Sequence, residues 1–136
     1  MIVALLAAGL LAGSEPVMTP DQLAEAVLTA GACEGAGWQA ADDDTGNAFI
    51  ESVARQHPGM TFEQFGEALM AAVPAARERI FGGAVADRDG YLVWADDFAR
   101  RCDALAVAHP LILQRRPDTD ARWAEERAQG AANRSN

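Results

Sequence analysis

The feature that most restricts the fold of this chain is a recurring helix start signal. Thr19 is followed three residues later by Gln22, and Thr61 is followed in the same way by Gln64. In each pair the hydroxyl and the amide side chain can cap the first turn of a helix reciprocally. Alanine and leucine also dominate over β-branched residues, which favours helix over strand. We therefore expect an all-α fold, a small helical domain of about five helices.

Glycine and proline residues predict where these helices end. The first helix is expected to stop at Gly31, which can adopt the left-handed conformation. The glycine-rich stretch 32–45 is expected to be a loop around Cys33 and Trp38. Later helices are expected to end or break at Pro58, Pro74, Gly82 and Gly130. The segment 109–117, which lies between two prolines, is expected to be a packed connector or a short strand.

Apolar residues at helical spacing predict which faces are buried. A stripe that recurs every three or four residues places its members on one side of a helix, against the core. Three such stripes are Leu23, Val27 and Ala30; Phe62, Phe65, Leu69 and Val73; and Trp94, Phe98, Cys102 and Leu105.

The N-terminus resembles an export signal. Residues 2–12 are all apolar or glycine, and the small residues Ala12, Gly13 and Ser14 follow them. Such a run is too short for an ordinary membrane span and fits a cleaved signal peptide, although no basic residue precedes it. A first core helix is the alternative. We expect a signal peptide over 1–14, a single helical domain over 15–130, a disordered tail over 131–136, and a periplasmic or secreted location.

The two cysteines, Cys33 and Cys102, are expected to form a disulfide. An even number of cysteines in an exported chain favours a bridge, because thiols oxidise outside the cytosol. Cys102 lies on the third apolar stripe, which places it on the buried side of its helix. The predicted bridge and the predicted export therefore support each other.

The charge of the chain is negative and unevenly distributed. The net charge is -9, and residues 1–54 contain eight acidic residues and no lysine or arginine. A negative field repels phosphate backbones, so nucleic acid is a disfavoured partner. A basic or envelope-associated protein, or a cation, is the more natural partner. Simple solubility is the alternative explanation of the acidity.

The stretch "DRDGYLVWAD", residues 87–96, resembles the centre of an EF-hand calcium loop. With Gly90 at the sixth position of the twelve-residue loop, Asp87, Asp89 and Asp96 occupy the third, fifth and twelfth positions. Upstream, "GMTFEQFGEALM" resembles the exit half of another such unit, so the resemblance covers about 45–106. It implies a pair of helix-loop-helix units that binds calcium through Asp87, Asp89 and Asp96. Two positions depart from the family: Val85 stands first, without a side-chain oxygen, and the twelfth residue is aspartate rather than glutamate.

The same acidic residues also have a structural explanation without a metal. Asp89 and Gly90 are common turn residues. Asp96 precedes Arg100 by four positions, and Asp97 precedes Arg101 by four, which suits ion pairs on an exposed helix face.

Three hypotheses for the function follow. The first is a non-catalytic binding module that acts on another protein outside the cytosol, because no catalytic constellation is evident. The second is an EF-hand-like calcium-binding protein. The third is a cell-envelope hydrolase in which Glu34 and the acids at 42–44 supply a pair of carboxylates, as glycoside hydrolysis requires.

Overall fold

The computed structural model describes residues 17–83 and 87–134. This part of the chain forms an all-α domain, as expected, together with one small antiparallel sheet. The elements are α2 (Pro20–Ala36), β1 (Gln39–Ala40), α3 (Asp43–Arg55), α4 (Phe62–Phe81), α5 (Arg88–Ala108), β2 (Leu113–Gln114) and α6 (Thr119–Ala132). The expected signal peptide, 1–14, lies outside the described residues. Within the described ranges, no helix is both long enough and apolar enough to span a bilayer.

The capping residues begin the helices where the sequence predicts. At α2 the Thr19 hydroxyl accepts a hydrogen bond from the Gln22 amide N–H at 3.1 Å, and the Gln22 side chain accepts one from the Thr19 N–H at 2.9 Å. Thr61 and Gln64 make the same pair of bonds at α4. These bonds satisfy N–H groups that have no partner within the helix, and they fix its first turn.

Helix α2 is longer than predicted. It continues through Gly31 and ends at Ala36, where Gly37 adopts a φ of 123° and its N–H bonds to the carbonyls of Cys33 and Glu34. The glycine that ends the helix in a left-handed conformation is therefore Gly37, and not Gly31 as predicted. Cys33 lies on the helix and is fully buried, so the loop predicted for 32–45 begins only after Ala36.

Helix α4 continues through Pro74, where a break was predicted. Ala72, Ala76 and Ile80 are buried on both sides of the proline. The ring of a proline removes one backbone hydrogen bond and crowds the preceding turn. Burial of this face against α2 outweighs that local cost and keeps the helix continuous.

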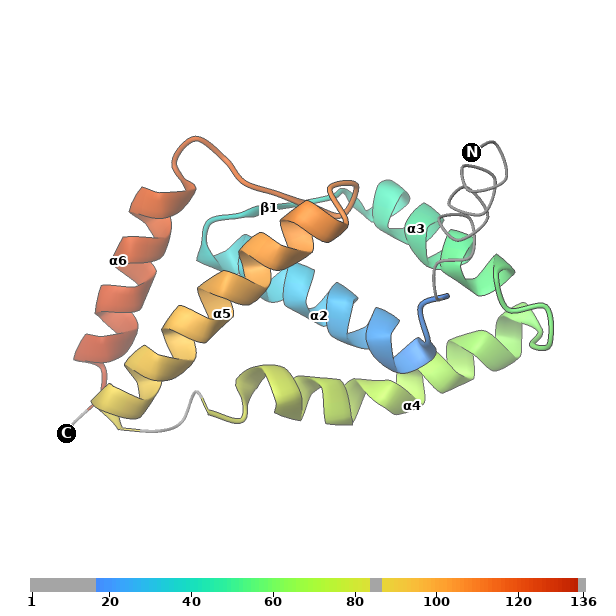
Figure 1. The fold of residues 1–136 in the computed structure, drawn as a ribbon, viewed down its shortest axis with the longest axis horizontal. Coiled ribbons are helices and arrows are strands. Elements are labelled where there is room, and N and C mark those ends of the chain that lie inside the picture. The colour runs from blue at the N-terminus through green and yellow to red at the C-terminus, as the bar shows by residue number, and fades with distance from the viewer. Residues whose placement is uncertain (1–16, 84–86, 135–136) are drawn as a thin grey trace, which may run out of the picture.

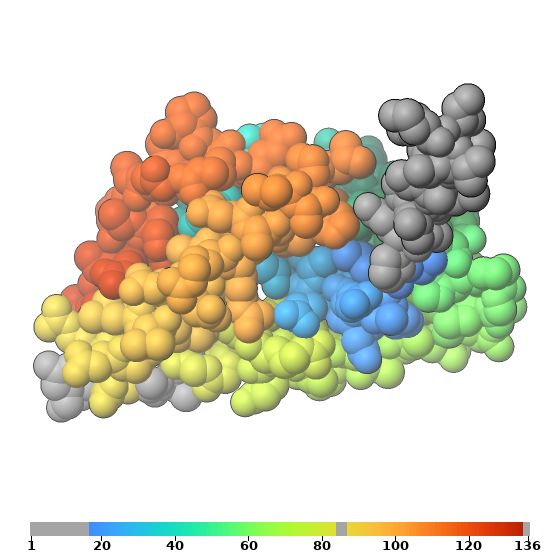
Figure 2. All heavy atoms as spheres, in the orientation of Figure 1, coloured from blue at the N-terminus to red at the C-terminus, as the bar shows by residue number. Residues whose placement is uncertain are grey.

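Helix α2 is the centre of the fold and packs against α4, α5 and α6. Figure 1 shows α5 crossing over α2, with α4 along one edge of the molecule and α6 beside α5. In Figure 2, α5 and α6 cover much of the face that is turned to the viewer. Ala24, Ala72 and Ala76 form the contact between α2 and α4, and their small side chains allow the two helices to approach closely.

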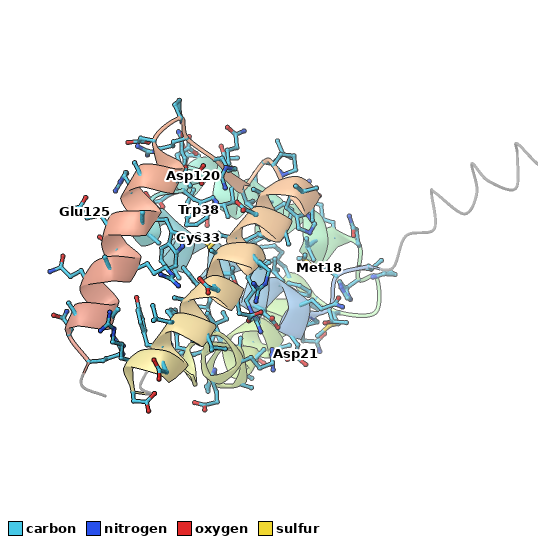
Figure 3. The ribbon with its side chains drawn as sticks, turned by 60° about the vertical axis from the view of Figure 1, so that its left-hand side comes forward. Met18, Asp21, Cys33, Trp38, Asp120 and Glu125 are labelled. Atoms are coloured by element: carbon cyan, nitrogen blue, oxygen red, sulfur yellow. A yellow bond between two sulfur atoms is a disulfide. The ribbon has the colours of Figure 1, made fainter. Side chains whose placement is uncertain are left out.

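The disulfide predicted between Cys33 and Cys102 is present and links α2 to α5. Both cysteines are fully buried, and their Cα atoms are 5.8 Å apart. Trp38, Ile80, Phe98 and Leu113 surround the bridge and form the largest cluster of the core. Figure 3 shows Cys33 and Trp38 in the interior, beside α5 and α6.

A second apolar cluster holds α3 and α4 against the start of α2. Leu23, Val53 and Phe65 are its large buried members. Two residues of the predicted apolar stripes are exposed and not buried: Phe62 is 61% exposed and Val27 is 38% exposed. Phe62 is the first residue of α4, so only one side of it faces the neighbouring helices.

Helix α6 and the small sheet close the other end of the molecule. Gln39 pairs with Gln114, and Ala40 with Leu113, which shows that the connector includes a short strand. The buried Thr119 hydroxyl donates to the Gly37 carbonyl at 3.0 Å and ties the start of α6 to the end of α2. Helix α6 passes Gly130 and ends at Ala132, and Ala131 is buried, so residues 131–132 belong to the helix and not to the predicted tail.

Candidate functional site

Three segments that are distant in the sequence meet at a cleft beside the small sheet. The second half of α2 supplies Glu34, β1 and the residue after it supply Ala40 and Ala41, and the start of α3 supplies Asp42 and Asp43. These five residues line two adjoining hollows. We call the pair of hollows the acidic cleft.

The two hollows of the acidic cleft differ in character. The smaller has a volume of about 240 Å³, and carbon-rich side chains from α2, α3 and the connector line much of it: Val27, Ala30, Phe49, Ile50 and Ile112. The larger has a volume of about 570 Å³ and is bounded by Gln39, Thr45, Pro110, Leu111 and Gln114. A ligand that fills both hollows would therefore meet an apolar region and a polar region separated by carboxylates.

Asp42 is fixed in position because it caps α3. Its carboxylate accepts a hydrogen bond from the Thr45 backbone N–H at 2.7 Å. That bond, and a further one from the Thr45 side chain, lower the pKa of Asp42 because they stabilise the charged form. Asp42 is therefore a permanent negative charge in the cleft at neutral pH, and the dipole of α3 stabilises it.

The carboxylates of the cleft differ from Glu25 in having no arginine among the described residues around them. Glu25, on the first half of α2, binds Arg79 of α4 at 3.0 Å and Arg101 of α5 at 3.1 Å. Within the described part of the chain, neither Glu34 nor Asp43 forms an ion pair, and none of the residues that line the cleft is basic. The negative charge of the cleft is thus available to a ligand.

The glycines of the cleft leave open space. A Cβ atom added at Gly31 or at Gly46 would meet no atom within 4 Å. Both residues line the smaller hollow. A side chain at Gly31 would therefore start from an unobstructed Cβ position beside the hollow, which makes this position suitable for blocking the site.

The carboxylates named in the hydrolase hypothesis come together in part. Glu34, Asp42 and Asp43 line the same cleft, although Asp44 is not among its lining residues. A general acid has to carry a proton at the working pH, and the lowered pKa makes Asp42 unsuitable for that role. Asp42 is suited to the role of an ionised carboxylate only.

The three carboxylates named for calcium binding lie at the N-cap of α5 and within its first half. Helix α5 begins at Arg88, so Asp89 and Asp96 lie on a helix where the EF-hand resemblance implied a loop. Asp87 is the N-cap, and its carboxylate accepts from the Gly90 N–H at 2.9 Å. Asp96 binds Arg127 of α6 at 2.9 Å. In the described ranges, no group of three or more His, Cys, Asp or Glu side chains is placed to hold a metal ion.

Calcium binding by Asp87, Asp89 and Asp96 stays a prediction that requires the first turns of α5 to rearrange. If it occurs, millimolar calcium should raise the melting temperature, because a ligand that binds only the folded state stabilises it. Asp89→Ala should remove that rise, whereas Asp44→Ala, at an exposed acid on α3, should keep it. A melting temperature that does not respond to calcium would dismiss the hypothesis.

The predicted ion pairs on α5 are present only in part. Arg101 binds Asp97 at 3.1 Å, four residues before it, as expected. Arg100 lies 3.8 Å from Asp97, rather than beside Asp96. Asp96 is turned toward α6 instead, where the tertiary contact with Arg127 replaces the local one.

Sequence reasoning missed the apolar part of the acidic cleft. Phe49, Ile50 and Ile112 come from α3 and from the connector, and nothing in their local pattern places them beside Gly31. One usable signal was Gly31, because a glycine within α2 leaves open space on the side of the helix that lines the smaller hollow.

No protein-family model, curated protein or solved structure matches the chain. The fold and the cleft define it as a small, disulfide-linked, all-α domain with an acidic surface hollow.

Proposed function

We propose that this chain is an exported, non-catalytic binding protein whose acidic cleft holds a basic and partly apolar segment of another protein. The observation that carries the proposal is the composition of the cleft. Three carboxylates separate an apolar hollow from a polar one, and none of the described residues that line either hollow is basic.

Charge supports a basic partner. Asp42 is kept ionised by its hydrogen bonds to Thr45, and Glu34 and Asp43 lie beside it without an arginine of their own. A cationic side chain that enters the cleft would gain attraction from all three carboxylates. The cationic side chain would not have to displace an arginine of this chain, so binding does not include the free-energy cost of breaking an ion pair.

The apolar hollow supports a partner that also has aliphatic side chains. Val27 is 38% exposed, and Phe49, Ile50 and Ile112 lie around the same space. Leu111, at the rim of the larger hollow, is 71% exposed. Burying such side chains would contribute binding free energy roughly in proportion to the apolar area covered.

The disulfide supports export. A buried bridge between Cys33 and Cys102 persists where thiols are oxidised, as in the periplasm or outside the cell. Mass spectrometry of the protein recovered from an envelope fraction tests this part of the proposal. Cleavage near Ser14 and a loss of two hydrogens at the cysteines are the expected result.

The binding proposal is tested with a short labelled peptide in which arginine alternates with leucine. We expect saturable binding by fluorescence anisotropy, weakened by salt, because exposed charges are screened. The double variant Glu34→Gln/Asp43→Asn should bind about tenfold more weakly, which corresponds to about 1.4 kcal/mol. Gly31→Leu should weaken binding as well, because its side chain fills the apolar hollow.

The matched control removes the same charge elsewhere. Glu67→Gln/Glu125→Gln changes two exposed acids on α4 and α6, outside the cleft, and should bind the peptide as the wild type does. Equal loss in both double variants would show that the net charge alone attracts the peptide. That result, or no effect of Gly31→Leu, would overturn the proposed site.

Hydrolysis by carboxylates is the second candidate, because Glu34, Asp42 and Asp43 share one cleft. In this case Asp42 would act in its ionised form, and a neighbouring carboxyl group would donate the proton. Incubation with cell-envelope glycan tests this candidate. Release of sugar by the wild type but not by Glu34→Gln would favour it over binding alone.

A further inference from the structure

We propose that a separate hollow, between α2, α5 and α6, binds a quaternary ammonium group. Its volume is about 300 Å³, and aromatic side chains form most of its wall: Phe81, Tyr91, Trp94, Phe98 and Trp123. Small residues of α2 form another side, and Glu126 of α6 completes the lining. We call it the aromatic cleft. It shares no lining residue with the acidic cleft, and the proposal does not depend on the function assigned there.

The aromatic side chains form one continuous group. The ring centroids of Trp94 and Phe98 are 5.0 Å apart, and those of Tyr91 and Trp94 are 5.6 Å apart. Trp123 of α6 lies 5.6 Å from Phe98 and closes the group from the opposite side. Trp94 is fixed in place because its indole N–H donates to the Ile80 carbonyl at 2.7 Å. The wall of the cleft is therefore preorganised.

A cation is the ligand that such a wall favours. The faces of aromatic rings carry partial negative charge and attract cations, most strongly where water is excluded. The molecule already makes this contact at one member of the group: the Arg134 guanidinium lies 4.0 Å from the centre of the Tyr91 ring. Glu126 adds a full negative charge to the lining of the cleft.

The lack of hydrogen-bonding groups selects the kind of cation. Among the described residues that line the aromatic cleft, only Glu126 and the Tyr91 hydroxyl have side-chain oxygens that can accept a hydrogen bond, because the indole N–H groups of Trp94 and Trp123 are donors. A primary ammonium or a guanidinium would lose hydrogen bonds to water that the aromatic rings of this wall cannot replace. A quaternary ammonium spreads its charge over methyl groups and has no N–H to satisfy.

Space in the cleft depends on Gly35. A Cβ atom added there would meet nothing within 4 Å, and Gly35 lies on the side of α2 that lines the cleft. Gly31, one turn earlier, faces the acidic cleft and is equally open. The two glycines therefore provide matched blocking positions on the same helix.

Titration with choline, followed by tryptophan fluorescence, tests the proposal, because Trp94 and Trp123 both line the cleft. We expect a saturable change in emission. Dimethylbutanol, the neutral carbon analogue of choline, should bind at least about tenfold more weakly, as expected when a cation-ring attraction is lost. Equal binding of the two compounds would overturn the proposal, because only the cation is attracted to the rings.

Variants locate the site. Gly35→Leu should abolish choline binding, whereas Gly31→Leu should leave it unchanged. Glu126→Gln should weaken it severalfold, whereas Glu125→Gln should have no effect, because Glu125 is not among the lining residues and points away from the molecule in Figure 3. Glu126 is exposed, so Glu126→Gln should fold normally. This variant therefore still tests the site if Gly35→Leu does not fold. Binding that survives both substitutions would overturn the proposal.

Two sources can present this group, a free solute and a lipid headgroup. Sedimentation with phosphatidylcholine vesicles, compared with phosphatidylglycerol vesicles, distinguishes them. Binding of free choline identifies a solute site, and binding to phosphatidylcholine vesicles alone, lost in Gly35→Leu, identifies a headgroup site. Binding of neither would overturn the proposal.

Discussion

At the scale of single residues, the backbone of α6 at Gly130 lies directly against the phenol of Tyr91. A Cβ atom added at Gly130 would overlap the hydroxyl and the ring of Tyr91. Tyr91 is buried between α5 and α6, with Ala95 and Ala131 beside it, so moving the ring would disturb this packing. The absence of a side chain at Gly130 is therefore a packing requirement of the contact between these helices.

Gly130→Ala should destabilise the protein by about 1–3 kcal/mol, the usual cost of overpacking a core. Gly66→Ala is the matched control, because Gly66 lies within α4 and an added Cβ atom there meets nothing within 4 Å. That change should stabilise by about 0.5–1 kcal/mol, since alanine favours helix over glycine. Chemical denaturation measures both, and destabilisation of equal size by both would contradict the argument.

The cap at Asp42 should make part of the stability depend on pH. Its pKa is lowered in the folded state, so its contribution is complete above the unfolded pKa and disappears as the pH falls through the folded pKa. The melting temperature of Asp42→Ala should lie below that of the wild type at neutral pH, and the difference should shrink in acid. The side chain of Asp42→Asn caps the helix but does not titrate, so the contribution of this cap to stability should not decrease in acid. A difference between wild type and Asp42→Ala that does not vary with pH would contradict this account.

At the scale of the elements, the positions where helices begin could be read from the sequence more reliably than the positions where they end. Thr19 and Thr61 begin helices as predicted, because a cap is a local interaction between neighbouring residues. Gly31 and Pro74 were expected to end or break helices and do neither. Both lie where α2 and α4 pack along their length, so tertiary burial decides the outcome there.

Pro74 should therefore be a site at which α4 can be stabilised. The proline gives the carbonyl of Met70 no N–H four residues later, and its ring crowds the preceding turn. Pro74→Ala should raise the free energy of unfolding by up to about 3 kcal/mol, measured by denaturant titration. Ala71→Pro, in the preceding turn and also exposed, should lower it. A loss of stability in Pro74→Ala would show that the course of α4 over α2 needs the proline.

At the scale of the whole molecule, the disulfide should account for a substantial part of the stability. The bridge closes a loop with a sequence separation of 69 residues, which corresponds to about 4 kcal/mol on the chain-entropy estimate. Reducing the protein should lower the denaturant midpoint by a matching amount. The double variant Cys33→Ala/Cys102→Ala should not respond to the reductant. An unchanged midpoint on reduction of the wild type would contradict the estimate.

The fold class and the bridge could be predicted at this scale, whereas the two clefts could not. The pairing of Cys33 with Cys102 follows from there being only two cysteines, and the all-α class follows from composition and caps. The acidic cleft needs α2, α3 and the connector together, and the aromatic cleft needs the end of α4 with α2, α5 and α6. The sequence identified the acids of the first cleft, but how the helices cross determines which side chains face each hollow.

The bridge also determines how the molecule would respond to being pulled at its two ends. A mechanical load would pass from α2 through the sulfur atoms into α5, so α3 and α4, which lie between the bridged residues, would not be stretched. Among the described helices, tension would be carried by α2 up to Cys33, by α5 beyond Cys102 and by α6. A single-molecule extension trace should therefore lengthen markedly once a reducing agent is added.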